Sequence, residues 1–512
     1  MGPRLEGQVA VVTGGGSGIG RATCLALARE ASHLIIVGRG PERLAETVDL
    51  IRPETDRHGT RAHALALDVR SEADMRVMAG RAAQWFGRAD ILVCSAGIAR
   101  PAGAGLRTVA QTPAADFDQV IATNLTGLFL SNRAVLPLMI PQGRGDILNL
   151  SSTAGLAGLP FDGPYCASKA GAIGLSEALA GEVGPLGVRV QVLVPGPFET
   201  EMWSRGGSRL RPGGQIPPAS RVADAAVYLL TLPRDVRMVA PVVKPLDLPT
   251  GGTLLGGFGS AKPAEAGPTD ARARRGVERP PGPPEDPGRL KGKVVIVTGG
   301  PEGLGREVCR LAAGEGAAVV VAGLDRARVD EAVAGLPTPA GTAAGHLGFT
   351  GDVRDEAGHQ DLVSAALERF GRLDALVTCA AAPRRPETSL AQTTTADWDL
   401  TLGTELRGVF LSNRAVLPAM TRQRSGIILN VSPAPGPDGV GPSCATGAGV
   451  RGLSQSIAEE VRGFGVKVQA VSPCGAEGPR AAGVAALILF MLTQPEDAVL
   501  VGPGLAPPGS FS

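Results

Sequence analysis

The segment GQVAVVTGGGSGIGRATCLALA, residues Gly7–Ala28, decides the fold because it joins a strand, a glycine-rich turn and a helix. Its first part is apolar and β-branched, which is typical of a strand buried on both faces. The turn TGGGSGIG, residues Thr13–Gly20, follows directly and opens a helical pattern. Glycines let such a turn approach a pyrophosphate, which then lies at the positive end of the helix. The segment therefore predicts a nucleotide-binding α/β unit.

A second copy of this segment, GKVVIVTGGPEGLGREVCRLAA, occupies residues Gly292–Ala313. The nonapeptide FLSNRAVLP also occurs twice, at Phe129–Pro137 and at Phe410–Pro418. Two more pairs of segments match, FGRADILV with FGRLDALV and GDILNLSS with GIILNVSP. The separation between the copies shortens along the chain, as small insertions or deletions in two diverged copies would produce. A repeat of this length indicates duplicated whole domains rather than a solenoid.

Within each copy, apolar strands alternate with helical patterns, which predicts a parallel sheet covered on both faces. The chain has 512 residues, too many for one typical domain. We therefore expect two tandem doubly wound α/β domains, at residues 1–249 and 289–512. The segment between them, residues 250–288, is rich in proline and glycine and is expected to be a linker.

The composition argues against several classes of function. The chain is 44% hydrophobic with a net charge of +1, so neither a nucleic-acid partner nor a membrane surface is indicated. The longest apolar run, Ala481–Leu492, is too short to span a bilayer, and the N-terminus resembles no secretory signal. The seven cysteines form no CxxC pair, and Cys24 and Cys309 lie in apolar helical patterns, which favours buried thiols over disulfides or metal ligands. We expect a cytoplasmic protein without a metal site.

Three side chains point to proton transfer. Tyr165 and Lys169, in YCASKAG, are four residues apart and therefore share one face of a helix. A phenol titrates at about 10, and we expect the neighbouring ammonium to lower the pKa of Tyr165 toward neutral pH. Ser152 ends a predicted strand, where its hydroxyl can hold a substrate oxygen.

In chain order these motifs resemble those of the short-chain dehydrogenase/reductase family. The turn has the spacing TGxxxGxG, CSAG (Cys94–Gly97) stands in the place of NNAG, and PGPFET (Pro195–Thr200) matches PGxxxT. The resemblance covers about Leu5–Pro249 and again Leu290 to near the C-terminus, and it implies Rossmann-type domains. It implies four catalytic residues, Asn124, Ser152, Tyr165 and Lys169. For cofactor binding it implies Tyr165 and Lys169 together with Gly14, Ser17, Gly18, Ile19, Gly20, Arg39, Asp68, Val69, Ala96, Gly97, Pro195, Gly196 and Thr200.

The resemblance also implies a mechanism, in which hydride moves between a nicotinamide ring and a carbonyl or carbinol carbon. Tyr165 would be the general acid in reduction and the base in oxidation. Lys169 would position the ribose and assist Tyr165, Ser152 would polarise the carbonyl, and Asn124 would support a water relay.

The choice of cofactor depends on the end of the second strand, LIIVGRGPERL. An acidic residue that would bind a ribose 2′-hydroxyl is missing there, and Gly38 and Arg39 stand instead. An arginine can pair with a 2′-phosphate through two hydrogen bonds. Ser17 is not basic, so only one of the family's two signals for NADP is present. NADP(H) is favoured, and NAD(H) stays open.

The second copy has lost the residues that carry the chemistry. It has Glu405, Pro433, Ser443 and Gly447 where the first copy has Asn124, Ser152, Tyr165 and Lys169. Glycine and proline side chains cannot donate, accept or carry charge. Glu302 replaces Ser17, Leu324 replaces Arg39, and SPCGAEG replaces VPGPFET. We expect a degenerate, non-catalytic domain; whether it binds nucleotide stays open.

The sequence thus predicts an NADP(H)-dependent oxidoreductase acting on a carbonyl or secondary alcohol, with the chemistry in the first half only. A ketoreductase-like substrate of 3-oxoacyl, polyketide or steroid-like type is expected, with Phe161, Phe198 and Trp203 either lining its site or packing a lid. In this family the helices carrying the nonapeptide and YxxxK usually pack against the same pair of a partner subunit. The second half is therefore expected to be an intramolecular pseudo-dimer partner. Further homodimerisation stays open, and so does the simpler reading that the nonapeptide only fills each domain's own core. The alternatives are a non-catalytic nucleotide-sensing or assembly protein and an NAD-dependent oxidant with the same residues.

Overall fold

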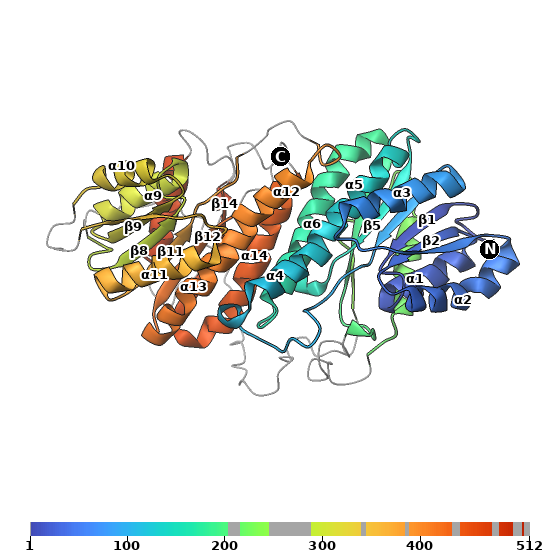
Figure 1. The fold of residues 1–512 in the computed structure, drawn as a ribbon, viewed down its shortest axis with the longest axis horizontal. Coiled ribbons are helices and arrows are strands. Elements are labelled where there is room, and N and C mark those ends of the chain that lie inside the picture. The colour runs from blue at the N-terminus through green and yellow to red at the C-terminus, as the bar shows by residue number, and fades with distance from the viewer. Residues whose placement is uncertain are drawn as a thin grey trace, which may run out of the picture.

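Two parallel sheets with the same strand order form the framework of the chain (Figure 1). The computed structural model describes residues 2–202, 216–244, 288–338, 345–383, 389–432, 441–473, 481–494 and 504–505. The predicted linker therefore lies outside the described residues except for Gly288.

In the first sheet the strand order is β3-β2-β1-β4-β5-β6-β7, and every pair is parallel. All five residues of β1 are buried, as expected for a strand covered on both faces. The order reverses between β1 and β4, and in such sheets ligands bind outside the carboxyl ends of the strands at this point. The strands are β1 Val9–Thr13, β2 His33–Gly38, β3 Ala62–Ala66, β4 Ile91–Cys94, β5 Gly145–Leu150, β6 Val188–Pro195 and β7 Val242–Val243. The α-helices are α1 Gly18–Arg29, α2 Pro41–His58, α3 Glu72–Phe86, α4 Ala114–Ile121, α5 Gly127–Met139, α6 Gly163–Val183 and α8 Ser220–Leu230.

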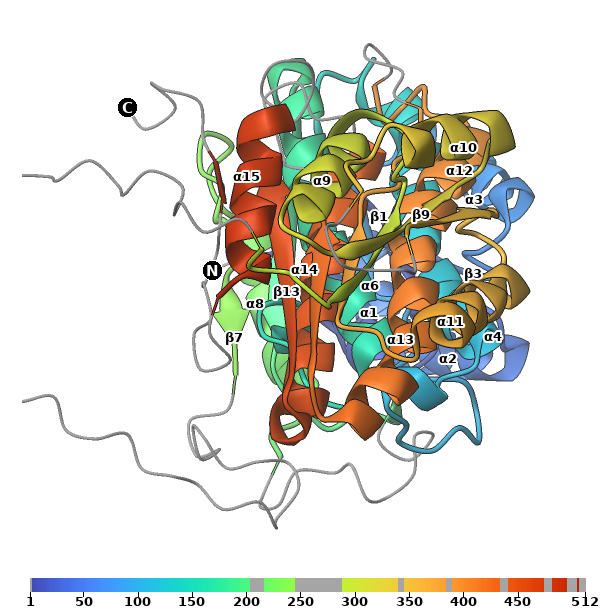
Figure 2. The ribbon, with the colours of Figure 1, turned by 90° about the vertical axis from the view of Figure 1, so that its left-hand side faces the viewer.

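The second sheet repeats this arrangement in the order β10-β9-β8-β11-β12-β13-β14. Figure 2 shows α9 and α15 side by side on one face of this sheet. The strands are β8 Val294–Thr298, β9 Ala318–Gly323, β10 Leu347–Thr350, β11 Ala375–Thr378, β12 Gly426–Val431, β13 Val466–Pro473 and β14 Gly504–Leu505. The α-helices are α9 Gly303–Gly314, α10 Arg326–Ala334, α11 Glu356–Phe370, α12 Thr395–Leu402, α13 Gly408–Gln423, α14 Gly441–Val461 and α15 Ala481–Leu492.

The inner helices of the two halves share one hydrophobic core. This core includes Leu125 and Phe129 of the first half and Leu406 and Phe410 of the second. The outer face of each sheet has a separate core, built on α1, α2 and α8 in the first half and on α9 and α15 in the second. Two sheets with a joint helical layer between them form the body of the molecule (Figure 1).

Helices α6 and α14 make the closest contact between the halves (Figure 1). A Cβ on Gly174 would lie 2.4 Å from the Cys444 carbonyl oxygen, and a Cβ on Gly452 would lie 2.8 Å from that of Cys166. Gly174 and Gly452 occupy equivalent positions in the two copies, as do Cys166 and Cys444. The halves are therefore related by a pseudo-twofold arrangement in which each helix offers glycine to the other's backbone.

Two aromatic stacks repeat this pseudo-symmetry. The ring centres of Phe129 and Trp398 are 4.1 Å apart, and those of Phe117 and Phe410 are also 4.1 Å apart. Phe129 and Phe410 are the first residues of the two nonapeptides. Arg133, also in the nonapeptide, donates to the Thr393 carbonyl at 2.7 Å. The nonapeptide thus reaches across to the other half as well as filling its own.

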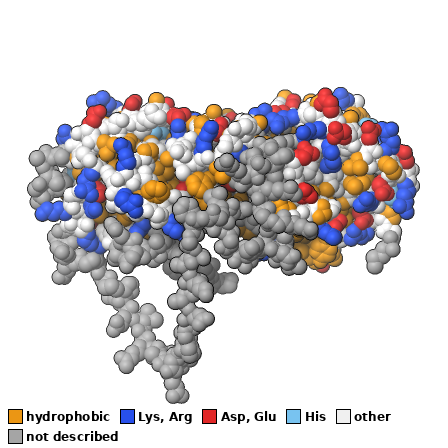
Figure 3. All heavy atoms as spheres, turned by 90° about the horizontal axis from the view of Figure 1, so that it is seen from below, with side chains coloured by type: hydrophobic (Ala, Val, Ile, Leu, Met, Phe, Trp, Pro, Cys, Tyr) orange, Lys and Arg blue, Asp and Glu red, His pale blue; other side chains and the backbone are white. Residues whose placement is uncertain are grey.

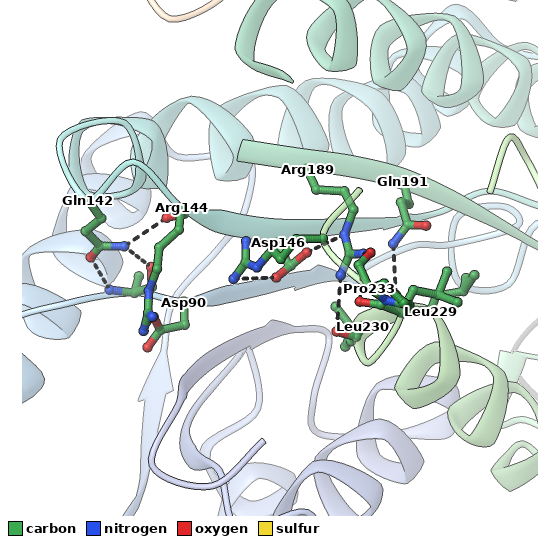
Figure 4. A network of polar contacts seen from close by, with 12 residues as sticks. Asp90, Gln142, Arg144, Asp146, Arg189, Gln191, Leu229, Leu230 and Pro233 are labelled. Atoms are coloured by element: carbon green, nitrogen blue, oxygen red, sulfur yellow. Dashed lines mark hydrogen bonds and ion pairs between the residues drawn. The ribbon is translucent and has the colours of Figure 1, made fainter. Parts of the chain in front are cut away.

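A buried ion pair lies at the amino ends of β5 and β6, opposite the carboxyl ends of the strands (Figure 4). Arg189 donates to Asp146 at 2.7 Å and to the carbonyls of Leu230 and Pro233 at 3.2 and 2.9 Å. Burial raises the pKa of Asp146 and Arg189 lowers it. The second sheet has Ile427 at the place of Asp146. This network fixes the C-terminal end of α8 to the sheet, which is a structural role.

Positive and negative side chains are interspersed on the face seen in Figure 3. Within the described ranges, no helix is both long and apolar enough to cross a membrane. The same residues hold no cluster of three or more metal-ligating side chains. The six described cysteines are free thiols, and burial raises the pKa of Cys24 to about 12.

Candidate active site

The glycine-rich loop between β1 and α1 closes tightly on itself. Gly14 has a φ of +69°, and a Cβ there would lie 2.7 Å from the Cα of Ala96. A Cβ on Gly20 would lie 2.3 Å from the Gly14 carbonyl oxygen. Ser17 is the N-cap of α1 and makes no side-chain capping bond. The loop therefore needs glycine at these positions, and the first turn of α1, which includes Ile19, keeps backbone N–H groups for an anion.

The segment after β6 returns to this loop. Gly196 donates its N–H to the Val243 carbonyl at 2.7 Å, directly after Pro195 ends the strand. A Cβ on Gly18 would lie 3.3 Å from the Cβ of Thr200. The structure thus brings Thr200 next to the glycine-rich loop from far along the chain.

Arg39 follows β2 and is exposed to solvent. Among the described residues it has no hydrogen-bond or ion-pair partner, and its charge lowers the pKa of Asp68 slightly. Arg70 is the main cause of that lowered pKa, because its guanidinium holds the Asp68 carboxylate at 2.6 and 3.0 Å. Val69 is buried, and a Cβ on Gly127 would lie 2.6 Å from its methyl group. The Arg39 guanidinium is therefore unpaired among the described residues, whereas the Asp68 carboxylate is held by Arg70.

Ser152, Tyr165 and Lys169 meet at the end of β5 and the start of α6. Ser152 lies just after β5 and its side chain caps a short 3₁₀ turn by accepting from the Ala154 N–H at 3.2 Å. Its side chain also hydrogen-bonds to Tyr165. The Lys169 ammonium is 5.7 Å from the Tyr165 ring centre and donates to the Leu150 carbonyl at 3.0 Å. Serine and lysine thus flank the phenol.

The prediction of a lowered pKa for Tyr165 is wrong in this structure. Burial of the phenol raises its pKa to about 12, and the hydrogen bond with Ser152 opposes the rise only in part. Burial also lowers the pKa of Lys169 to about 8. The i,i+4 spacing places both side chains on one face of α6, as predicted. Desolvation of both groups, however, outweighs the attraction between the Lys169 ammonium and a Tyr165 phenolate, on which the pKa prediction was based. At neutral pH the Tyr165 phenol is therefore protonated.

Asn124 lies in a π-helical turn, Ala122–Thr126, between α4 and α5. Its Nδ2 donates to the Ile98 carbonyl at 2.8 Å and to Ser168 Oγ at 3.0 Å, and its Oδ1 accepts from the Ile98 N–H at 2.8 Å. A Cβ on Gly97 would lie 3.3 Å from Asn124 Oδ1 and 3.5 Å from Lys169 Nζ. Asn124 therefore fixes the end of β4 against the helix that carries Tyr165 and Lys169.

Sequence reasoning missed two supporting hydroxyl groups. Ser151 Oγ donates to the Lys169 carbonyl at 2.7 Å, and Ser168 accepts from Asn124. Both serines are buried, and each is adjacent in sequence to a predicted catalytic residue. That adjacency is the one feature of the sequence that could have pointed to them. Of the three aromatic residues near the expected substrate, Phe198 lies in the outer hydrophobic core and Phe161 is half-buried. Trp203 lies outside the described residues.

The second half has the same framework around different side chains. Glu405 is buried in the equivalent π-helical turn and accepts from Thr446 Oγ1 at 2.6 Å and from the Ala382 N–H at 3.4 Å. Ser443 and Gly447 lie at the start of α14, where α6 has Tyr165 and Lys169, and Pro433 lies outside the described residues.

The glycine-rich loop of the second half is altered as well. Glu302 is the N-cap of α9 and forms an ion pair with Arg328. A Cβ on Gly323 would lie 2.4 Å from Pro301, so the proline fills space beside the loop. Leu324, at the position of Arg39, is 70% exposed. A carboxylate at the N-terminus of a helix disfavours the approach of a second anion there.

Known proteins share this architecture. The family model described as short chain dehydrogenase matches residues 8–209 and again residues 293–485. A 2-dehydro-3-deoxy-L-rhamnonate dehydrogenase (NAD(+)) of Sphingomonas is 39% identical over 197 residues, which are 38% of this chain and 74% of that protein. A 3-oxoacyl-acyl-carrier-protein reductase of Thermotoga maritima is 34% identical over 233 residues, 44% of this chain and 91% of that protein. Levodione reductase of Leifsonia aquatica is 33% identical over 258 residues, which are 48% of this chain and 94% of that protein.

Two solved structures resemble both halves together. The C-domain of a bacterial malonyl-CoA reductase with NADP aligns with a TM-score of 0.73 and 17% identity, over 97% of each chain. The N-domain of such an enzyme with NADP aligns with a TM-score of 0.72 and 18% identity, over 99% of each chain. At this identity the likeness shows the two-sheet fold alone. Because the family model matches more than half of the sequence in two consecutive copies, the chain belongs to the short-chain dehydrogenase/reductase family as a tandem duplication.

Proposed function

We propose that this protein is an NADP(H)-dependent oxidoreductase that interconverts a ketone and a secondary alcohol, with all of its chemistry in the first half. The observation that carries the proposal is the meeting of Ser152, Tyr165 and Lys169 at the edge of the sheet where the strands end, the edge that also carries the glycine-rich loop. Relatives include a 3-oxoacyl-acyl-carrier-protein reductase and levodione reductase, which favours a ketone of 3-oxoacyl, polyketide or comparable cyclic type.

The residues of the first half fit a nicotinamide dinucleotide. Gly14 and Gly20 lie where any Cβ would clash, so the loop stays thin enough for a pyrophosphate to approach. The unpartnered Arg39 suits a 2′-phosphate. Thr200, next to Gly18, and Lys169 are the groups proposed to hold the nicotinamide and ribose end. When bound, the dinucleotide supplies or accepts the hydride.

The side chains of this chain then handle the proton. Ser152 and Tyr165 donate hydrogen bonds to the carbonyl oxygen and so stabilise the negative charge that develops there. Because the pKa of Tyr165 is raised, the phenol is protonated and passes its proton to that oxygen in the reducing direction. Lys169, whose pKa is lowered to about 8, lies beside the ring and is the proposed source of the replacement proton. Asn124 holds the end of β4 in register with Lys169, and its predicted part in a water relay stays a proposal.

The second half is proposed to have lost catalysis. None of Glu405, Ser443 or Gly447 can act as a phenolic acid with a neighbouring ammonium. The negative charge of Glu302 at the N-terminus of α9 would repel a phosphate, and Leu324 has no charge to pair with a 2′-phosphate. The second half instead supplies the helical surface against which α6 packs.

Two measurements test the proposal on the intact chain. Calorimetric titration is expected to find one tight site per chain for NADPH and weaker binding of NADH. Tyr165→Phe is expected to abolish ketone reduction while leaving that site nearly unchanged. Binding of neither nucleotide would favour a non-catalytic assembly protein, and full turnover by Tyr165→Phe would refute the assigned acid.

A further inference from the structure

The loop that leads into the catalytic helix is held in an unusual backbone conformation. It connects the 3₁₀ turn after Ser152 to α6, whose first turn carries Tyr165. Phe161, four residues before Tyr165, has a φ of +66°. A bulky residue adopts this conformation only where its surroundings enforce it. The contacts that hold this loop therefore influence where Tyr165 lies.

Helix α14 of the second half makes several of those contacts, beside the bond from the Leu159 N–H to Cys166 Sγ and the Arg100–Asp162 ion pair within the first half. Glu460 accepts from the Phe161 N–H at 3.0 Å with one carboxylate oxygen and from the Val109 N–H at 2.8 Å with the other. Ser456, one turn earlier, donates to the Leu159 carbonyl at 2.5 Å. A Cβ on Gly158 would lie 2.4 Å from the Ser456 nitrogen, so the loop backbone lies directly against α14.

The equivalent contact on the other side of the pseudo-twofold involves Glu182 of α6, and the segment equivalent to residues 158–161 lies outside the described residues. Glu182 of α6 accepts from the Leu390 N–H at 2.7 Å, as Glu460 does from Val109. At the place of Ser456, however, α6 has Ala178, which offers no hydroxyl. The Ser456 hydroxyl, which bonds to the loop of the first half, therefore has no counterpart on α6.

We propose that Glu460, assisted by Ser456, is a positioning residue for the active site of the first half. It acts through the backbone of residues 158–162 and sets the place of Tyr165 relative to Ser152. The inference rests on the proposed function for its catalytic meaning. It makes the degenerate half part of the active-site support, contributed from the same chain.

Charge makes this support sensitive to pH. Burial raises the pKa of Glu460 to about 7; the two N–H donors lower it and the Asp162 carboxylate raises it further. Asp162 is paired with Arg100, and Cys166 of α6 is the other titratable group in electrostatic contact with Glu460. An ionised carboxylate accepts from both N–H groups equally, whereas protonation converts one oxygen into a hydroxyl. The hold on Phe161 therefore weakens as pH falls below about 7.

The chain offers a direct probe, because its two tyrosines are Tyr165 and Tyr228. Full-length protein labelled with 3-fluorotyrosine should give two fluorine NMR signals, and Tyr228→Phe assigns them. Glu460→Gln and Ser456→Ala are compared with the matched variant Glu182→Gln, which changes the twin contact at the same interface. Ketone reduction is measured in parallel with NADPH and ethyl acetoacetate.

Glu460→Gln and Ser456→Ala are expected to shift the Tyr165 signal, and Glu182→Gln to leave it in place. The wild-type signal is expected to move with a midpoint near pH 7, and Glu460→Gln to abolish that movement. We expect kcat to fall about 10- to 100-fold in Glu460→Gln with an unchanged KM for NADPH, as for a misplaced catalytic group.

An unchanged Tyr165 signal in Glu460→Gln, or an equal shift in Glu182→Gln, overturns the inference. If Glu460→Gln does not fold, Ser456→Ala decides by the same criterion. If the wild type reduces no ketone, the proposed function fails by itself, and the Tyr165 signal still decides whether Glu460 positions the phenol.

Discussion

Replacing Lys169 with methionine should remove turnover and stabilise the fold at neutral pH. Lys169 is 6% exposed, and burial lowers its pKa from 10.5 to about 8. The difference corresponds to about 3 kcal/mol by which the folded state disfavours the charged amine. Loss of the 3.0 Å hydrogen bond to the Leu150 carbonyl costs about 1–2 kcal/mol in return. Methionine has a similar length and no charge, so a net gain of about 1–2 kcal/mol is expected at pH 7.

The dependence on pH makes this prediction specific. Because the pKa of Lys169 is lower in the folded chain than in the unfolded chain, the penalty is fully present below pH 8 and shrinks between pH 8 and 10.5. Above that range the amine is neutral in both states, and only the hydrogen bond to Leu150 distinguishes the two proteins. The advantage of Lys169→Met should therefore vanish and then reverse as pH rises.

Urea unfolding followed by tryptophan fluorescence measures this difference at pH 7 and at pH 10, alongside NADPH-dependent ketone reduction. Lys291→Met, at an exposed lysine, is the control and should change the free energy of unfolding by less than about 0.5 kcal/mol. A Lys169→Met protein that is less stable than the wild type at pH 7, with no trend toward higher pH, would refute the argument from burial.

Three further substitutions test other parts of the structure. Arg39→Ala should weaken NADPH binding about 10- to 100-fold, because it removes a charged hydrogen bond worth about 1.5–3 kcal/mol. NADH binding, measured by the same calorimetry, should not change. Equal weakening of NADPH and NADH binding would exclude contact between Arg39 and a 2′-phosphate. Gly20→Val should abolish NADPH binding because a Cβ would lie 2.3 Å from the Gly14 carbonyl, whereas Gly305→Val, its match in the second half, should leave binding intact if only the first half takes nucleotide. Gly174→Ala should lower the stability of the folded chain, because the added Cβ would clash with α14. Gly181→Ala lies on the same helix with no atom within 4 Å of its Cβ, and it should raise the stability by up to about 1 kcal/mol in thermal unfolding. A gain in stability at both positions would show that α6 and α14 can move apart without cost.

Local patterns made the fold and the proposed catalytic set predictable. Gly20 lies against the Gly14 carbonyl within the same loop, and Gly14 has a positive φ. The i,i+4 pair Tyr165 and Lys169 follows from helix geometry alone. The pKa of Tyr165 was not predictable in this way, because it depends on how much of the phenol the surrounding fold shields from water. Phe198 similarly belongs to the outer core rather than to a substrate wall, which depends on the path of the chain after β6. Glu460 lies 299 residues from Phe161, and no spacing rule links them.

The nonapeptide is identical in the two copies, and its side chains make contacts that involve both halves. Phe129 stacks on Trp398 and Phe410 on Phe117, so each nonapeptide begins with a residue that packs against the other half. Within each half, the asparagine of the nonapeptide bonds to an asparagine of β5 or β12, Asn132 with Asn149 at 3.0 Å and Asn413 with Asn430 at 2.8 Å. A change in the nonapeptide would therefore disturb its own sheet and the joint core at once. The proposed acid–base residues carry no such double role, since one working set would be sufficient for turnover. Replacement of a buried lysine by Gly447 even removes the desolvation penalty that Lys169 imposes on the first half. The contacts between the halves thus involve residues of both copies, whereas the proposed chemistry needs the residues of one copy.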